Sequence, residues 1–262
     1  MIIGLFDTGI GGLLALRKFV QALPNQKFLY LADAARMPYG SHSPEEVVGF
    51  TEQMLRWMEY KGVTAVLIAC NTSCSVLLKR DDMATRIFGV LESGVSAAAK
   101  FGTRIGILAT PVTALSQMYS KKIKELKPTA IVHEVPCLEL VTMIESGEID
   151  LSVLRQYVEP LLLQDIDSII YGCSHYPVLE KEIRAIIMSE TRKDICLIDP
   201  ADHFVDDVVT ALSLEKSSVS DITQNNLLRN VTIYTTGKAE DFEKKIYRHL
   251  RLKLPVFSTN LE

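Results

Sequence analysis

The chain has 262 residues, of which 48% are hydrophobic and 23% charged, with a formal net charge of −4. This composition is typical of a globular protein with a core large enough for one large domain or two small ones. The charge balance argues against nucleic acid as a partner, because the lysine-rich segment at 121–127 is best interpreted as the solvated face of a helix. No apolar run approaches the roughly 18 residues that cross a membrane, so we expect no membrane association.

The cysteines indicate the redox environment of the protein. An odd number of them, widely spaced in a sequence that lacks an export signal at its first residues, predicts free thiols and a cytoplasmic location. The spacing of the first two cysteines differs from that of a redox-active dithiol, which argues against a dithiol oxidoreductase. The five positions are Cys70, Cys74, Cys137, Cys173 and Cys196.

The first part of the chain alternates strand and helix patterns. A helix over residues 13–22 and a second one that begins at Ser43 and ends near Gly62 separate the first three strands. The strands are predicted from continuous apolar runs, typical of buried parallel strands, at residues 2–6, 27–32, 63–69 and 87–91.

A glycine-rich loop, residues 7–12, lies between the first strand and the first helix. Such a loop exposes backbone N–H groups at a helix N-terminus and is suited to an anionic ligand. It lacks the residues of a phosphate loop and the spacing of a dinucleotide fingerprint, so a simple tight turn is the competing interpretation.

The pattern restarts in the second part of the chain. Residues 105–110 resemble residues 3–8, and Cys173 follows its strand as Cys70 does about 100 residues earlier, which indicates an internal duplication. We therefore predict an α/β protein with two similar three-layer lobes, mainly parallel sheets and a pseudo-twofold relation. The predicted lobes comprise residues 1–92 with 205–262, and residues 93–204, so that the C-terminal segment returns to the first sheet.

Ligands of parallel α/β sheets bind at the carboxyl ends of the strands, where both Cys70 and Cys173 lie. We therefore expect the two thiols to face each other across a site in the cleft between the lobes. A thiolate at a helix N-terminus has a lowered pKa and can remove a proton, while a thiol opposite delivers one, which inverts a carbon centre without a cofactor. Asp7 and His175 are suited to adjust the two thiols. Groups suited to hold a substrate's carboxylates and ammonium are Thr8, Asn71, Thr72 and Ser174.

The motifs resemble those of the glutamate racemases, within the cofactor-independent aspartate/glutamate racemase superfamily. The resemblance covers nearly the whole chain, and it is most specific at Pro-Tyr-Gly and Cys-Ser-His-Tyr-Pro. The matching segments are residues 4–12, 33–40, 69–72 and 172–177. Thr8 stands where the family usually has serine, Ser174 where it has threonine, and Leu138 where it often has proline.

The resemblance implies an isomerase that interconverts L- and D-glutamate, with no cofactor or metal, as a homodimer that supplies D-glutamate for bacterial peptidoglycan. It implies that Cys70 deprotonates D-glutamate and Cys173 L-glutamate, with Glu145 as an acidic residue near the second thiol. Asp7 and His175 are expected to assist the thiols. The implied substrate contacts are Asp7, Thr8, Tyr39, Gly40, Asn71, Thr72, Ser174 and His175.

Other functions remain open at this stage. A racemase of aspartate or hydantoins would keep both cysteines, although the segment 38–40 argues against it. A decarboxylase of the superfamily would need one cysteine only. A pyridoxal-phosphate enzyme is disfavoured because no lysine follows a strand beside a phosphate-binding loop. A two-lobed binding protein without catalysis would not need matched thiols.

Overall fold

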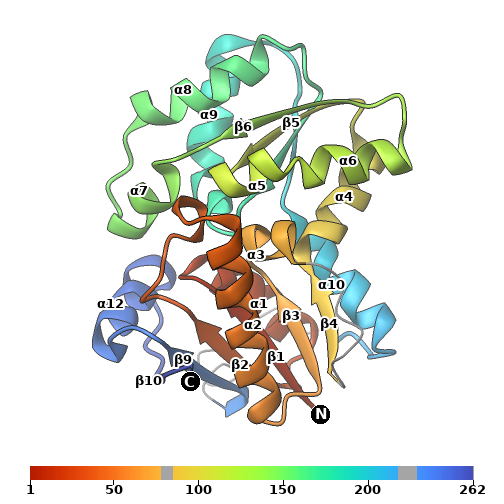
Figure 1. The fold of residues 1–262 in the computed structure, drawn as a ribbon. Coiled ribbons are helices and arrows are strands. Elements are labelled where there is room, and N and C mark those ends of the chain that lie inside the picture. Colours follow the sequence, from red (N-terminus) through yellow and green to blue (C-terminus); the bar gives the residue numbers. More distant parts are fainter. Residues whose placement is uncertain (78–84, 218–228, 262) are drawn as a thin grey trace.

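The first lobe is built on a parallel sheet of six strands. A computed structural model describes residues 1–77, 85–217 and 229–261 of the chain (Figure 1). The order of the strands is β10-β9-β2-β1-β3-β4, and all of the pairings are parallel. The strands are β1 (Ile2–Asp7), β2 (Lys27–Ala32), β3 (Ala65–Ile68), β4 (Arg86–Gly89), β9 (Val231–Thr235) and β10 (Val256–Ser258).

The second lobe repeats the first on a smaller sheet. Its order, β6-β5-β7-β8, matches the order β2-β1-β3-β4 of the first sheet, and its pairings are also parallel. The two sheets confirm the predicted α/β fold with two similar lobes. The strands of this sheet are β5 (Arg104–Ala109), β6 (Ile131–Pro136), β7 (Ser168–Gly172) and β8 (Cys196–Ile198).

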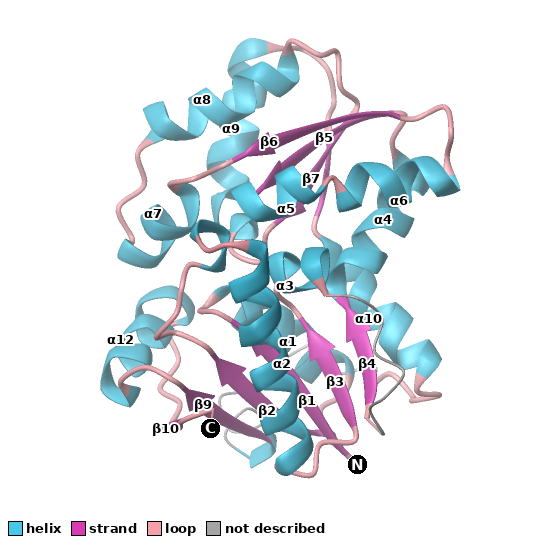
Figure 2. Ribbon diagram, in the orientation of Figure 1, coloured by secondary structure: helices cyan, strands magenta, loops and turns pink. Residues whose placement is uncertain are grey.

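Helices cover the sheets of both lobes (Figure 2). In the first lobe these are α1 (Gly11–Ala22), α2 (Pro44–Tyr60), α3 (Asn71–Val76) and α12 (Ala239–Leu250). In the second lobe and along the junction they are α4 (Val90–Phe101), α5 (Pro111–Ser116), α6 (Met118–Leu126), α7 (Leu140–Ser146), α8 (Leu151–Leu162), α9 (Glu180–Glu190) and α10 (Pro200–Ala211). Two 3₁₀ turns, Tyr39–Ser41 and Tyr176–Leu179, lie near the junction of the lobes.

The predicted start of α2 is confirmed in detail. Ser43 Oγ accepts from Glu46 N at 3.2 Å, and Glu46 Oε2 accepts from Ser43 N at 2.8 Å, which forms a capping box. Two predicted strands are too long. The strand predicted over residues 63–69 covers only residues 65–68, and β4 ends at Gly89, where Val90 begins α4. Val90 and Leu91 are buried on α4, and a short apolar run does not distinguish a strand from the buried face of a helix.

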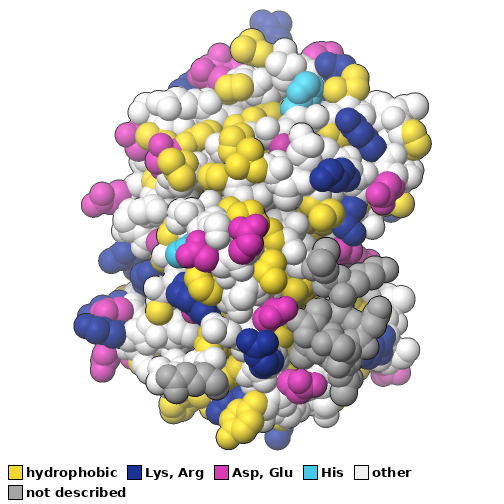
Figure 3. Space-filling model, viewed as in Figure 1, with side chains coloured by type: hydrophobic (Ala, Val, Ile, Leu, Met, Phe, Trp, Pro, Cys, Tyr) yellow, Lys and Arg dark blue, Asp and Glu magenta, His cyan; other side chains and the backbone are white. Residues whose placement is uncertain are grey.

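The C-terminal segment joins the first sheet, because β9 pairs with β2 and β10 pairs with β9. We retain the division into residues 1–92 with 205–262, and 93–204, as a proposal. No helix within the described ranges is long and apolar enough to cross a membrane. On the face that Figure 3 shows, lysine and arginine side chains are interspersed with acidic ones and form no continuous basic patch.

The C-terminal ends of the strands point towards the junction of the lobes. In Figure 2 the arrowheads of β1, β2 and β3 point towards the second lobe. The segments that follow β1, β3, β5 and β7 therefore meet there, which is where parallel α/β sheets carry their sites.

Candidate active site

A small enclosed cavity lies at the junction of the lobes. Its volume is about 10 Å³, roughly the space of one water molecule. Residues from both lobes line it, and nine of them are among those predicted from the sequence. The lining residues are Thr8, Pro38, Tyr39, Gly40, Cys70, Asn71, Thr72, Thr110, Val141, Cys173, Ser174 and His175.

The two cysteines lie in opposite lobes and line the same cavity. Each is 5% exposed, so both thiols are shielded from bulk solvent. Cys70 is the N-cap of α3 and accepts a hydrogen bond at Sγ from Ser73 N at 3.5 Å. Cys173 follows β7 directly and precedes the turn that begins at Tyr176. The structure therefore brings together the pair of thiols that the sequence pattern predicted.

The electrostatic setting of Cys70 differs from our expectation. The position at a helix N-terminus led us to expect a lowered pKa. Instead burial, together with the nearby Asp7 carboxylate, raises the pKa of Cys70 to about 12 and outweighs the Ser73 N–H group. Helix α3 has only six residues, and desolvation of a buried thiolate costs more than so short a helix recovers.

Asp7 lies at the end of β1 and is fully buried. Its Oδ1 accepts from the backbone N–H groups of Thr8 at 2.6 Å and Gly9 at 3.3 Å. Its Oδ2 is buried and has no hydrogen-bond partner among the residues that the structure describes. Burial raises the pKa of Asp7, against the lowering influence of His175, of the Ser174 hydroxyl and of the two N–H groups. Asp7 can therefore hold or release a proton near Cys70.

His175 connects Cys173 to Glu145. Its Nε2 lies 2.9 Å from Glu145 Oε1, and because a carboxylate only accepts, this nitrogen carries the hydrogen. Its Nδ1 lies 3.8 Å from Cys173 Sγ. Burial by itself would lower the pKa of His175, but its contacts with Cys173 and Glu145 outweigh this effect and raise it well above the usual value. The protonated ring therefore presents a positive charge to the Cys173 Sγ atom.

Glu145 is held as a carboxylate although it is only 5% exposed. Burial would raise its pKa, but His175, Lys245 and the N–H group of Ile10 together lower it to about 2. Ile10 N donates to Glu145 Oε1 at 3.0 Å, and Ile10 is the residue that precedes α1. The carboxylate thus lies at the N-terminus of α1, where the helix dipole favours a negative charge.

The structure gives the glycine-rich loop a role that differs from both interpretations of its sequence. The N–H groups of the loop bind two carboxylates of the protein itself, Asp7 and Glu145. Close packing also requires glycine here, because a Cβ atom at Gly9 would lie 2.2 Å from Glu145 Oε1 and one at Gly11 would lie 2.8 Å from His175 N. The loop joins the two lobes at the site, so neither a simple turn nor a phosphate-type anion site describes it.

The predicted hydroxyl and amide groups are also at the cavity. Thr8 Oγ1 lies 3.4 Å from Asp7 Oδ1, and Ser174 Oγ lies 3.5 Å from His175 Nδ1. The two residues that differ from the usual family residues therefore both make a polar contact through their hydroxyl groups. Asn71 Oδ1 accepts from Tyr119 Oη at 2.6 Å, which leaves the Asn71 amide N–H groups to donate elsewhere.

Tyr39 and Gly40 both line the cavity, but neither offers a free hydroxyl group there. The Tyr39 hydroxyl donates to Asp33, which also binds Arg36 Nε at 2.7 Å and accepts from Thr236 Oγ1 at 2.7 Å. The Tyr39 hydroxyl is therefore bound by Asp33 in this arrangement. A Cβ atom at Gly40 would lie 2.5 Å from Thr110 Cβ, so the close approach of the two lobes requires glycine.

Two threonines, Thr110 and Thr113, lie at the site and were not predicted as site residues. Thr110 Oγ1 lies 2.9 Å from Thr72 Oγ1 and 3.0 Å from Thr113 Oγ1, and all three side chains are buried. The internal repeat contained the signal, because Thr110 follows β5 as Thr8 follows β1. Thr113 offers no such signal, since its position depends on the local turn of α5.

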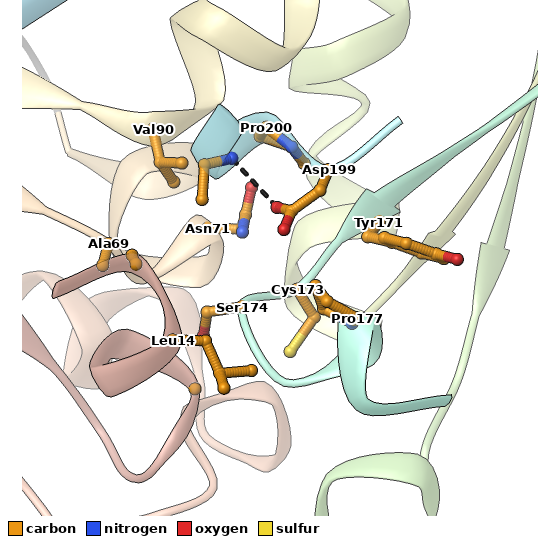
Figure 4. Close-up of a pocket in the computed structure, with 13 residues that line it drawn as sticks. Leu14, Ala69, Asn71, Val90, Tyr171, Cys173, Ser174, Pro177, Asp199 and Pro200 are labelled. Carbon is orange, nitrogen blue, oxygen red and sulfur yellow. Dashed lines mark hydrogen bonds between the residues drawn. The ribbon is translucent and has the colours of Figure 1, made fainter. Parts of the chain in front are cut away.

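A second small cavity lies behind Cys173, towards α10 (Figure 4). Cys173, Ser174 and Asn71 line both cavities. Figure 4 shows the Tyr171 ring directed away from the other lining side chains, whereas Cys173 and Ser174 extend into the space between the lobes. The two cavities therefore adjoin at these shared residues.

Comparisons with known proteins indicate the family of the chain. The family model of the Asp/Glu/hydantoin racemases matches residues 12–208. The chain is 41% identical over 219 residues to a glutamate racemase of Trichormus variabilis, covering 81% of this chain and 72% of the relative. It is 40% identical over 218 residues to a glutamate racemase of Gloeobacter violaceus, covering 81% of both.

Solved structures show the same fold over almost the full length. A glutamate racemase of Bacillus anthracis superposes with a TM-score of 0.86 at 29% identity, covering 99% of this chain and 97% of that one. A glutamate racemase of Francisella tularensis, solved in complex with D-glutamate, superposes with a TM-score of 0.84 at 27% identity and the same coverage. The chain therefore belongs to the Asp/Glu/hydantoin racemase family of isomerases.

Proposed function

We propose that this enzyme interconverts L-glutamate and D-glutamate by a two-base mechanism that needs no cofactor. The observation that carries the proposal is the placement of Cys70 and Cys173, from opposite lobes, on one enclosed cavity. The similarity to glutamate racemases at about 40% identity supports glutamate as the substrate. The segment Pro38-Tyr39-Gly40, which lines the cavity, favours glutamate over aspartate within the family.

In the direction from L to D, the Cys173 thiolate removes the α-hydrogen and the Cys70 thiol delivers its own proton to the opposite face of the carbon. His175 stabilises the Cys173 thiolate, and the raised pKa of Cys70 keeps that thiol protonated until it is needed. The reverse direction exchanges the roles, with Asp7 accepting the proton of Cys70. After each turnover the protons return through Asp7 and His175.

The polar groups of the cavity suit the substrate. The Asn71 amide and the hydroxyls of Thr8, Thr72 and Ser174 can donate to carboxylates, and Thr110 adds a further hydroxyl. Oδ2 of Asp7, which has no hydrogen-bond partner in the described part of the chain, can accept a hydrogen bond from the α-ammonium group. An ammonium group in this buried site favours thiolates, because it compensates their charge where water does not. These groups must share at least about 8 kcal/mol of barrier lowering, the lower end for enzymes.

Glutamate is far larger than the cavity, so the lobes or loops must separate to admit it. Two larger hollows, of about 560 and 540 Å³, meet at Ser41 and Leu138, which lie on opposite lobes beside the cavity. We propose that substrate reaches the thiols between these two segments. The closed arrangement excludes water, which strengthens the electrostatic interactions at the reacting carbon.

We also propose a cellular setting. D-glutamate is a component of bacterial peptidoglycan, and the family resemblance supports a role in supplying it for cell-wall biogenesis and cell shape. The five free cysteines favour the reducing cytoplasm. A homodimer is the proposed assembly, again on the basis of the resemblance.

Polarimetry with a panel of substrates tests the proposed activity. With no cofactor added, the optical rotation of L-glutamate and of D-glutamate is expected to decay to zero at similar rates. Aspartate is expected to react about 10- to 200-fold more slowly, the discrimination that one missing methylene group gives, and hydantoins more slowly still, since their ring closes the α-carboxyl and α-amino groups. Faster racemisation of aspartate or of a hydantoin than of glutamate would overturn the substrate assignment.

A further inference from the structure

A chain of polar contacts leads from the cavity to the C-terminal helix. Cys173 Sγ faces His175 Nδ1, His175 Nε2 binds Glu145 Oε1, and Glu145 Oε2 lies 2.9 Å from Lys245 Nζ. Lys245 is on α12, which belongs to the C-terminal segment of the first lobe, whereas Glu145 is on α7 of the second lobe. Figure 1 shows α12 on the same side of the molecule as α7, across the junction of the lobes.

The position of Lys245 matches what the buried Glu145 carboxylate requires. Oε1 of Glu145 is shared by Ile10 N and His175 Nε2, so its second oxygen needs a partner of its own. The Glu145 side chain is only 4% exposed, whereas that of Lys245 is 28% exposed. A buried carboxylate is expensive unless it is paired. Among the described residues, Lys245 is the one cation within ion-pair distance of Oε2.

Helix α12 is fixed firmly enough to hold this lysine in place. Phe242 and Ile246 are buried at its base. Arg248, one turn beyond Lys245, donates to Ser146 O at 2.8 Å and to Glu145 O at 3.4 Å, where α7 ends. The two cations therefore bind α7 at both its backbone and its Glu145 side chain.

We propose that Lys245 is a positioning residue of the active site, which orients and compensates the Glu145 carboxylate and through it holds His175 against Cys173. It acts on the Cys173 half of the reaction and not on the Cys70 half. The motifs that identify the family do not include it, because it lies in the C-terminal segment. The inference rests on the proposed two-thiol function and adds a residue to it.

The first test is the turnover of Lys245→Met on glutamate. We expect kcat to fall about tenfold or more, because the buried Glu145 carboxylate loses the cation that pairs with it, while KM changes less than threefold. Lys245→Arg, which restores the cation, should recover most of the activity. The matched control is Lys244→Met on the same helix, whose amine pairs with the exposed Asp241 at 3.2 Å, and it should match the wild type.

Isotope effects show which half of the reaction is affected. The equilibrium constant of a racemisation is one, so kcat/KM must fall equally in both directions and cannot locate the defect. In Lys245→Met the deuterium isotope effect on kcat/KM should rise for α-deuterated L-glutamate, whose hydrogen Cys173 removes. It should fall for α-deuterated D-glutamate, whose hydrogen Cys70 removes. A merely structural role would move both effects in the same direction.

A double-mutant cycle completes the test. If Lys245 acts through Glu145, Lys245→Met should have no further effect on kcat in a Glu145→Gln background. Three outcomes would overturn the role of Lys245 and leave the proposed function standing. They are wild-type turnover in Lys245→Met, an equal loss of kcat in the Glu145→Gln background, and isotope effects that change in the same direction. A wild type that does not racemise glutamate would instead overturn the proposed function, and the inference with it.

Discussion

Replacing Cys70 or Cys173 with alanine is expected to lower the racemisation of glutamate by about 10³-fold or more, since each variant lacks one of two acid–base groups that are each worth about 10² to 10⁴. Each reaction direction needs both thiols, one as base and one as acid. Removing either should therefore affect L-glutamate and D-glutamate alike in polarimetry. The matched control is Cys196→Ala, which removes an exposed thiol on β8 and should leave the rate unchanged.

The two cysteine variants should still differ in one respect. Cys70→Ala keeps the base for L-glutamate and should exchange the α-hydrogen of that enantiomer alone with solvent, with retention of configuration. Cys173→Ala should exchange that of D-glutamate alone. Racemisation at the wild-type rate by either variant would show that one of the thiols is dispensable and that the two-thiol mechanism is wrong.

Substituting alanine for Gly11 is expected to lower turnover strongly, through packing rather than chemistry. The new Cβ atom would lie 2.5 Å from Ser174 Oγ, 2.7 Å from His175 Nδ1 and 2.8 Å from His175 N. Backbone cannot yield as a flexible side chain does, so the lobes must separate at the site. We expect activity to fall at least about 100-fold, in keeping with a displacement of about 1 Å of the reacting groups. Overpacking should lower the free energy of unfolding by about 1–3 kcal/mol.

Gly49→Ala is the matched control for this substitution. Gly49 lies within α2, and a Cβ atom there would meet nothing within 4 Å. Alanine should therefore stabilise the helix by about 0.5–1 kcal/mol in urea unfolding, and polarimetry should show normal activity. A fully active Gly11→Ala variant would mean that the contact of the glycine-rich loop with His175 is not required for catalysis.

Much of the fold could be predicted because strands and repeats are local or periodic features. Continuous apolar runs marked β1, β2 and β3, and the resemblance of residues 105–110 to residues 3–8 indicated a second lobe. The same repeat placed Cys70 and Cys173 at equivalent strand ends, and the structure brings both to one cavity. The short β10 was not predicted, because its three residues depend on pairing with β9 rather than on a pattern of their own.

The parts of the site that the sequence did not reveal depend on contacts between distant residues. The bond from Ile10 N to Glu145 Oε1 spans 135 positions. Through this hydrogen bond, the glycine-rich loop, whose pattern suggested a ligand site, binds the carboxylate of Glu145 from the other lobe instead. The ion pair of Lys245 with Glu145 likewise has no local signature. The raised pKa of Cys70 follows from burial beside Asp7, which the position at a helix N-terminus could not reveal.

The most direct test of the two-thiol mechanism is the exchange of the α-hydrogen of L-glutamate with solvent. The purified wild-type protein is incubated with L-glutamate in D₂O without added cofactor, and proton NMR and optical rotation are followed together. The two-base mechanism predicts that the α-proton signal disappears as the rotation decays to zero, with deuterium in the D-glutamate formed. Retention of both the α-proton signal and the rotation would contradict it.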